Sequence, residues 1–232
     1  MRHRYLSPTW WVSRLAGEAE RFVSPRRTTP ALVWAAMRSG ELELRRLEEL
    51  VPRYRVALDV GASLGMYTSR LNRLARQVHA FEPHPELAAR LRLAVPKAKV
   101  HALALSDRDG EAELRIPVVA GVAYHGWGSI EPENHLEAVR CSAVRSVRVP
   151  SRRLDSLELD DMGFIKIDVE GHELAMLRGA EQTLSRCRPI LLSEAEDRHR
   201  PDAVDSVRTY LTGIGYAMPP ALSHGMWTAV HA

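Results

Sequence analysis

Between residues 55 and 107 the sequence alternates short apolar runs with amphipathic stretches, and this alternation limits the possible folds more than any other feature. The runs RVALDVG, VHAFEP and VHALALSD predict three strands. The stretches MYTSRLNRLARQ and PELAARLRLAV, which lie between these runs, have apolar residues at helical spacing and predict two helices. Strands joined by helices run parallel and are connected by right-handed crossovers. The chain is therefore predicted to form an α/β domain around a parallel sheet.

The rest of the chain extends this pattern. The strand-like stretches EAELRIPVV and SAVRSVRVPSRRLDSL enclose a polar and aromatic segment, which is predicted to form a long loop over one end of the sheet. They are followed by the strand FIKIDV, the helix HELAMLRGAEQTL, the strand PILLSEAE and the helix AVDSVRTYLTGIG. YAMPPAL and MWTAVHA predict a terminal hairpin with an antiparallel last strand. Residues 1–50 are interpreted as a helical extension and residues 51–232 as the main domain.

The composition fits a globular domain with a large core, since 45% of the 232 residues are hydrophobic and 26% are charged. No apolar run approaches the roughly 20 residues of a membrane-spanning helix, and Pro8 and Arg14 argue against a signal peptide. The spacing of Cys141 and Cys187 suggests neither a metal site nor a disulfide framework, so a cytoplasmic location is expected. The net charge of +3 comes from scattered arginines, so nucleic acid is not expected as a partner. The oligomeric state stays open.

A glycine turn, LDVGASLGMYT, follows the first predicted strand and favours a nucleotide-type ligand. Gly61 and Gly65 allow positive φ or a close backbone approach. Glu82 ends the next strand, where a carboxylate can accept hydrogen bonds from ribose hydroxyls. The turn lacks the third glycine of a dinucleotide site and the lysine of a P-loop, and Asp59 would repel a phosphate.

Acidic residues end four of the predicted strands, namely Asp59, Glu82, Asp107 and Asp168. S-adenosylmethionine carries ribose, adenine and two cationic groups but no phosphate, so acidic strand ends suit it electrostatically. The sequence therefore favours S-adenosylmethionine as the cofactor. Two alternatives stay open. One is a nicotinamide-dependent oxidoreductase, which the missing glycine disfavours, and the other is a non-catalytic nucleotide- or nucleic-acid-binding protein, which only the basic charge supports.

Six motifs in a fixed order resemble the FkbM-type methyltransferases, a family of class I S-adenosylmethionine-dependent enzymes. They are DVGASLGMYT, FEPHP, ALSDRDG, LDSL, FIKIDVEGHELAMLRGA and PILLSEAE, and the resemblance runs from about residue 55 to residue 197. The resemblance implies a Rossmann-like, mostly parallel sheet of seven strands with helices on both faces. It also implies methyl transfer to a hydroxyl of a sugar, glycolipid, surface glycan or polyketide-type natural product. The cofactor-binding positions would be Asp59, Gly61, Ser63, Gly65, Glu82 and Asp107, and the family usually has Asn where this chain has Ser63.

The stretch FIKIDVEGHE ends a predicted strand with an acidic run and one imidazole. A hydroxyl must lose its proton to become a good nucleophile, and His172 is a candidate general base because its unperturbed pKa of about 6.5 lies near working pH. Asp168 or Glu170 could serve instead or orient the imidazole. Alternatively, His172 and Glu173 simply begin the following helix, where a carboxylate favours the helix dipole.

Two further expectations concern a metal and the acceptor. Asp168 and Glu194 are predicted to end neighbouring strands, and their oxygens would suit Mg²⁺ if a divalent ion is used. In the long loop, Tyr124, His125 and Trp127 combine stacking area with polar groups and are expected to bind a small-molecule or glycan acceptor. Trp127 could instead pack the loop onto the sheet.

Overall fold

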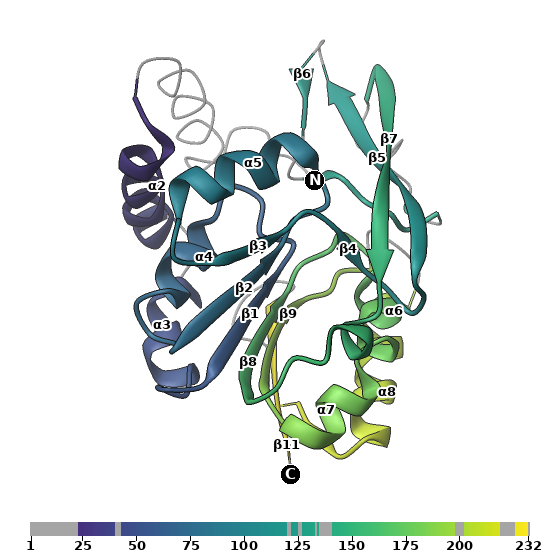
Figure 1. The fold of residues 1–232 in the computed structure, drawn as a ribbon. Coiled ribbons are helices and arrows are strands. Elements are labelled where there is room, and N and C mark those ends of the chain that lie inside the picture. The colour runs from purple at the N-terminus through teal and green to yellow at the C-terminus, as the bar shows by residue number, and fades with distance from the viewer. Residues whose placement is uncertain are drawn as a thin grey trace.

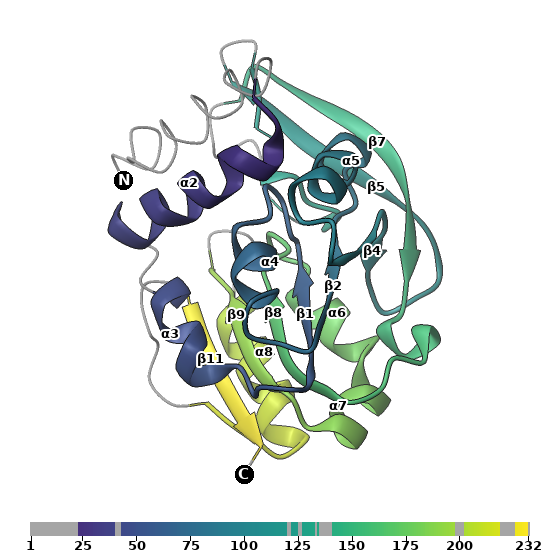
Figure 2. The ribbon, with the colours of Figure 1, turned by 60° about the vertical axis from the view of Figure 1, so that its left-hand side comes forward.

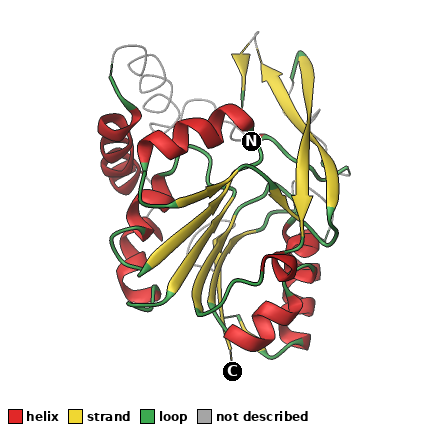
Figure 3. Cartoon of the chain, in the orientation of Figure 1, coloured by secondary structure: helices red, strands yellow, loops and turns green. Residues whose placement is uncertain are grey.

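The fold consists of a central sheet with helices on both faces and a smaller sheet beside it (Figures 1 and 3). The computed structural model describes residues 23–39, 43–119, 122–124, 127–132, 134, 141–197, 202–218 and 226–231. No helix within these ranges is both long enough and apolar enough to cross a membrane. The α/β fold predicted from the alternating pattern is confirmed.

The central sheet has seven strands in the order β10-β11-β9-β8-β1-β2-β3. The strands are β1 (Val56–Val60), β2 (Gln77–Phe81), β3 (Lys99–His101), β8 (Met162–Ile167), β9 (Ile190–Glu194), β10 (Tyr216–Ala217) and β11 (Met226–His231). β11 pairs antiparallel with β9 and β10, and the remaining pairs are parallel. The predicted terminal hairpin and antiparallel last strand are thus confirmed. Strand order reverses between β1 and β8, and ligands bind at such a switch point in open α/β sheets.

Helices cover the two faces of this sheet (Figures 1 and 2). On one face lie α3 (Glu43–Leu50), α4 (Met66–Leu71) and α5 (Pro85–Ala94), and α2 (Pro25–Ser39) packs across α4 and α5. On the other face lie α6 (Glu173–Arg178), α7 (Glu181–Cys187) and α8 (Ala203–Gly213). The described part of residues 1–50 is mainly helical, while the domain boundary at residue 50 stays a prediction.

An apolar core fills the space on each side of the sheet. Leu44, Leu71 and Phe164 belong to the cluster under α3 and α4, whereas Ile165 and Leu177 belong to the cluster under α6 and α7. Every residue of β1 and β8 is buried, because both faces of these strands are covered. This double coverage explains why their sequences are nearly continuous apolar runs and do not alternate with polar residues. It also makes any polar residue inside them conspicuous.

The second sheet was not predicted as a separate layer. It consists of β4 (Ala104–Leu105), β5 (Gly110–Val119), β6 (Val122–Ala123) and β7 (Ala143–Arg152), in the order β4-β7-β5-β6. β5 and β7 pair antiparallel along nine residues, and a short 3₁₀ helix, η4 (Leu154–Leu157), follows β7.

The predicted third strand, VHALALSD, is wrong in its second half. Only Lys99–His101 joins the central sheet, whereas Ala104–Leu105 pairs with β7. Ala104 is buried in a separate apolar cluster with Leu114, so the second sheet, and not the central one, covers this apolar residue. As a consequence, Asp107 does not end a strand of the central sheet.

Candidate active site

A cavity of about 390 Å³ opens at the carboxyl edge of the central sheet, beside the switch point between β1 and β8. Its volume lies in the range of small-molecule sites, roughly 300–1,000 Å³. Six of the residues that the sequence singled out line it, and these are Gly61, Ser63, Glu82, Asp168, Glu170 and Glu194. The fold therefore brings the glycine turn and the acidic strand ends around one cavity.

The glycine turn after β1 touches the turn after β8. Gly61 has a φ of +76°, and a Cβ atom at this position would lie 1.8 Å from the backbone oxygen of Asp168. Only glycine permits both the positive φ and this contact. Gly65, with a φ of +81°, immediately precedes α4 and packs against Leu91, and it is not part of the cavity wall.

Glu82 is held in place at the cavity wall by backbone groups. The backbone N–H of Ser63 donates to its Oε2 atom at 2.7 Å, and that of His84 donates to its Oε1 atom at 2.8 Å. Burial, which outweighs these two hydrogen bonds, raises the pKa of Glu82 to about 7. The carboxylate is therefore preoriented, with acceptor capacity left for ligand hydroxyls. Ser63 has a left-handed φ of 48°, a conformation that Asn adopts more readily than Ser.

Lys166, which the sequence interpretation missed, lies at the centre of the site. It is in β8, it is 2% exposed, and it lines the cavity. Its Nζ atom donates to the backbone oxygen of Gly61 at 2.9 Å and lies 3.4 Å from Oδ2 of Asp168. A lysine inside an otherwise apolar strand was the sequence signal for such a role, because a buried ammonium needs anionic partners.

The carboxylates around Lys166 keep it charged. Burial alone would lower the pKa of its ammonium group, but the charges of Asp168, Asp59 and Glu194 outweigh burial and raise the pKa above its ordinary value. Asp59 is opposite Lys166 in the register of β1 and β8, and its Oδ1 atom is 3.5 Å from Nζ. The other oxygen of Asp59 accepts a hydrogen bond from Thr68 at 2.5 Å.

Asp59 itself does not reach the cavity. Its side chain is fully buried and is absent from the described wall, so it acts on the site through Lys166. Asp107 also lies away from the wall, with its half-exposed carboxylate 3.4 Å from Arg108. Their contact with a cofactor stays a prediction.

The expected Mg²⁺ site finds no support either. Asp168 and Glu194 both line the cavity, but the ammonium group of Lys166 lies beside them. Among the residues that the structure describes, no group of three or more His, Cys, Asp or Glu side chains could hold a metal ion.

His172 and Glu173 both begin α6. His172 is the residue before its first turn; it is 6% exposed and is not part of the cavity wall. Its ring nitrogens contact Ser106 and Glu131. Glu173 accepts a hydrogen bond from the backbone N–H of Gly171 at 3.0 Å, and burial raises its pKa to about 7. The alternative that these residues start the helix describes their position correctly.

The aromatic residues of the long loop stack on each other. The rings of Tyr124 and Trp127 are 5.0 Å apart at 23°, and neither residue lines the cavity. His125 lies outside the described residues. Gly128 and Ile130 of the same segment line the cavity instead. Acceptor binding by Tyr124, His125 and Trp127 stays a prediction.

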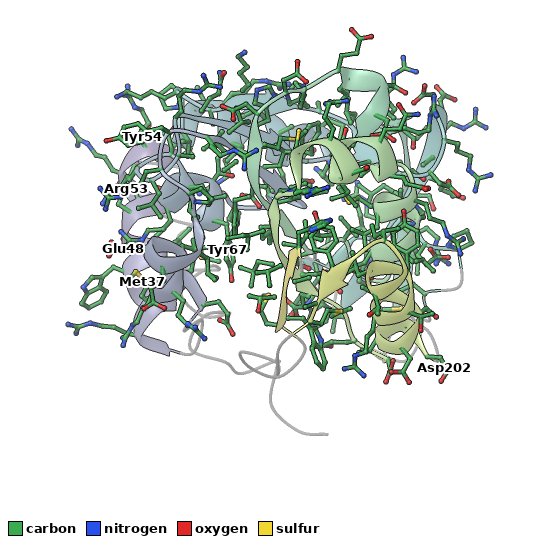
Figure 4. All side chains as sticks on the ribbon, turned by 90° about the horizontal axis from the view of Figure 1, so that it is seen from below. Met37, Glu48, Arg53, Tyr54, Tyr67 and Asp202 are labelled. Carbon is green, nitrogen blue, oxygen red and sulfur yellow. The ribbon has the colours of Figure 1, made fainter. Side chains whose placement is uncertain are left out.

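The end of the cavity near β9 and β11 receives side chains from outside the glycine turn. Glu43 of α3, Tyr67 of α4 and Met226 of β11 line it. Tyr67 points inward from α4 (Figure 4), and its ring centre is 5.0 Å from Nζ of Lys166. The described wall holds five carboxyl side chains and one cationic side chain, so the cavity favours cationic over anionic ligands.

The strand order of the central sheet, with the antiparallel strand β11 between β9 and β10, is that of the class I S-adenosylmethionine-dependent methyltransferase fold. The position of the cavity over the first glycine turn also fits this fold. Residues 59–218 match the model of the methyltransferase FkbM domain. The chain belongs to the FkbM family of methyltransferases.

Known proteins resemble the chain to different degrees. The chain is 32% identical over 149 residues to the 2-O-methyltransferase NoeI of Sinorhizobium fredii (strain NBRC 101917 / NGR234), a match that covers 58% of this chain and 61% of that protein. It superposes on the methyltransferase FkbM from Methylobacillus flagellatus KT with a TM-score of 0.55 at 16% identity, covering 95% of this chain and 58% of that one. Magnesium protoporphyrin IX methyltransferase from Synechocystis PCC 6803 with bound SAM gives a TM-score of 0.46 at 10% identity, over 100% of this chain and 86% of that one. The chain thus spans about three fifths of the first two relatives.

Proposed function

We propose that the protein is an S-adenosylmethionine-dependent O-methyltransferase that acts on a hydroxyl of a sugar, glycolipid, surface glycan or polyketide-type natural product. The observation that carries this proposal is one cavity with two different sides. The glycine turn and Glu82 form one side, and the acidic ends of β8 and β9 form the other. Membership of the FkbM family supports methyl transfer, and the relative named as a 2-O-methyltransferase supports oxygen as the acceptor atom.

The residues on the first side fit S-adenosylmethionine. Glu82 presents a fixed carboxylate for ribose hydroxyls, and Leu103 and Leu105 supply apolar surface for a flat base. The excess of carboxylates suits a ligand with sulfonium and ammonium groups. The same excess opposes the pyrophosphate of a nicotinamide cofactor and the phosphates of a nucleic acid. When bound, S-adenosylmethionine supplies a methyl group activated by its positively charged sulfur.

On the second side, the chain has to align the acceptor hydroxyl and remove its proton. Asp168 lines the cavity with a side chain that is 29% exposed, so an acceptor can reach it. We assign to Asp168 the role of receiving the hydroxyl proton while Lys166, 3.4 Å away, holds the carboxylate in position. Glu170 and Glu194 lie on the same wall and bind further hydroxyls of the acceptor. Correct alignment of the reacting atoms can lower the barrier by about 7–11 kcal/mol.

The proposal is tested by supplying S-adenosylmethionine with a deuterated methyl group together with a panel of methyl glycosides, glycolipids and hydroxylated polyketides. Mass spectrometry then follows the label. The expected product carries the label on oxygen, where mild base does not remove it. Transfer to a nitrogen or carbon atom, or no transfer by protein that binds the cofactor across the whole panel, contradicts the O-methyltransferase assignment.

A further inference from the structure

Three side chains from distant parts of the chain form a buried hydrogen-bonded row. Oε2 of Glu131 lies 2.9 Å from Nδ1 of His172, and Nε2 of His172 lies 2.9 Å from Oγ of Ser106. The row has the composition of a nucleophilic triad. However, Ser106 is 3% exposed and does not line the cavity, so a substrate carbonyl has no access to its hydroxyl. The row therefore calls for a different role.

Both ring nitrogens of His172 are engaged in either protonation state. The carboxylate of Glu131 can only accept, so Nδ1 carries a hydrogen. In the neutral ring, Nε2 accepts from the hydroxyl of Ser106. In the charged ring, Nε2 donates to Ser106, whose hydroxyl can donate to Oδ1 of Asp107 at 3.2 Å. No nitrogen is left to take a proton from an acceptor in the cavity.

The row is one of several contacts that fasten the segment 127–132, together with Asn134, to the turn before α6. The hydroxyl of Ser129 and the side-chain amide of Asn134 both donate to the backbone oxygen of Glu170, at 2.7 and 2.6 Å. Glu170 has a left-handed φ of 53°, which is costly for a residue other than glycine and needs such support from its surroundings. On the far side of the segment, the guanidinium group of Arg115 donates to the backbone oxygen of Glu131 at 2.6 Å.

This segment and this turn form one wall of the cavity. Gly128 and Ile130 line the cavity from the segment, and Val169 and Glu170 line it from the turn. The bond between Glu131 and His172 joins the two parts across 41 positions of sequence. A shift of the segment would therefore change the shape of the cavity on the side assigned to the acceptor, while the two backbone groups that hold Glu82, those of Ser63 and His84, lie outside the segment and the turn.

We propose that His172 is a positioning residue that, through Glu131, locks the segment 127–132 against the turn at Glu170 and so sets the acceptor-binding wall. The contact between His172 and Glu131 does not depend on the proposed function, whereas its effect on the acceptor rests on that function. His172→Ala removes both contacts, whereas His172→Asn keeps a donor near the place of Nδ1. Glu131→Ala removes the carboxylate that accepts from Nδ1, and Glu113→Ala removes an exposed carboxylate on β5 as the matched control.

Amide hydrogen exchange tests the lock without any acceptor. In His172→Ala, exchange over residues 127–132 should become at least tenfold faster, while that of β1 stays unchanged. His172→Asn should restore most of the protection, and Glu113→Ala should behave as wild type. Unchanged exchange over residues 127–132 in both His172→Ala and Glu131→Ala overturns the proposal.

Kinetics with an acceptor found in the labelling screen separates positioning from proton transfer. His172→Ala and Glu131→Ala should each raise the acceptor KM about tenfold, keep kcat within about threefold, and leave the Kd for S-adenosylmethionine unchanged. The double variant should be no worse than the poorer single variant, since both changes break one contact. A hundredfold loss of kcat in His172→Ala alone, with KM and hydrogen exchange as in wild type, would make His172 a base and overturn the proposal. If neither wild type nor any variant transfers methyl groups, the proposed function fails. The hydrogen-exchange result still shows whether His172 holds the segment 127–132 in place.

Discussion

The ammonium group of Lys166 donates a hydrogen bond to the backbone oxygen of Gly61 at 2.9 Å, and this bond ties β8 to the glycine turn that follows β1. The same ammonium lies within ion-pair distance of Asp59 and Asp168. Lys166 is thus the shared cationic partner of the fully buried Asp59 and of the proposed base Asp168, and it also binds the glycine turn. The acidic strand ends that suggested a metal are balanced, at least in part, by a lysine.

Replacing Lys166 by Met should destabilise the protein by about 3–5 kcal/mol, because Asp59 would keep a buried charge without its cationic partner. Urea unfolding monitored by circular dichroism gives the free energy of unfolding. Lys99→Met, at an exposed position of β3, is the control and should change stability by less than about 0.5 kcal/mol. The double variant Asp59→Asn/Lys166→Met should recover part of the loss. A Lys166→Met protein as stable as wild type would show that the ion pairs contribute nothing.

Replacing Glu173 by Gln should change how stability depends on pH. Because burial raises the pKa of Glu173 from 4.5 to about 7, the folded state binds its proton more tightly than the unfolded state. Its stabilising contribution is therefore complete below about pH 4.5 and is lost as the pH rises through about 7. The free energy of unfolding of wild type, relative to Glu173→Gln, should fall by a few kcal/mol between pH 5 and pH 8.

Denaturant titrations at pH 5, 6.5 and 8 measure this difference. Glu181→Gln, at an exposed position in the first turn of α7, provides the control and should differ from wild type by a constant amount. A difference between wild type and Glu173→Gln that does not vary with pH would contradict the raised pKa.

Replacing Asp168 by Asn should lower turnover by about two orders of magnitude or more, since the variant keeps the shape of the side chain but cannot accept the proton. Its melting temperature should change little, because Lys166 keeps Asp59 as a partner. Asp160→Asn changes an exposed carboxylate just before the same strand and should retain full activity. Wild-type kinetics in Asp168→Asn would remove this residue from the mechanism. Activity that a chelator abolishes would instead point to a metal shared with Glu194.

The features that could be predicted from the sequence are those that local patterns determine. The apolar runs of β1, β2 and β8 have to be buried, and the turn at Gly61 has to follow the first of them, so the switch point and its acidic residues could be located in advance. Glu82 was identified for the same reason, because its place depends only on the end of β2.

The features that were missed depend on contacts between distant segments. A lysine inside the apolar run of β8 indicates a buried ion pair, but its partner Asp59 follows only from the register of β8 against β1, which no local pattern encodes. Asp107 was misplaced because an apolar run such as ALAL fits a strand of either sheet equally well. The contact of His172 with Glu131 likewise requires the long excursion to fold back onto the sheet.

The central claim, that the cavity binds S-adenosylmethionine through the glycine turn and Glu82, is tested most directly by calorimetric titration with S-adenosylhomocysteine. We expect one site per chain in wild type, a Kd weaker by about ten- to a hundredfold in Glu82→Ala because a charged hydrogen bond to ribose is lost, and no binding of NAD. Glu86→Ala, at an exposed position in the first turn of α5, should bind as wild type does. Equal affinity of folded Glu82→Ala and wild type, or binding of NAD in place of S-adenosylhomocysteine, would contradict the account.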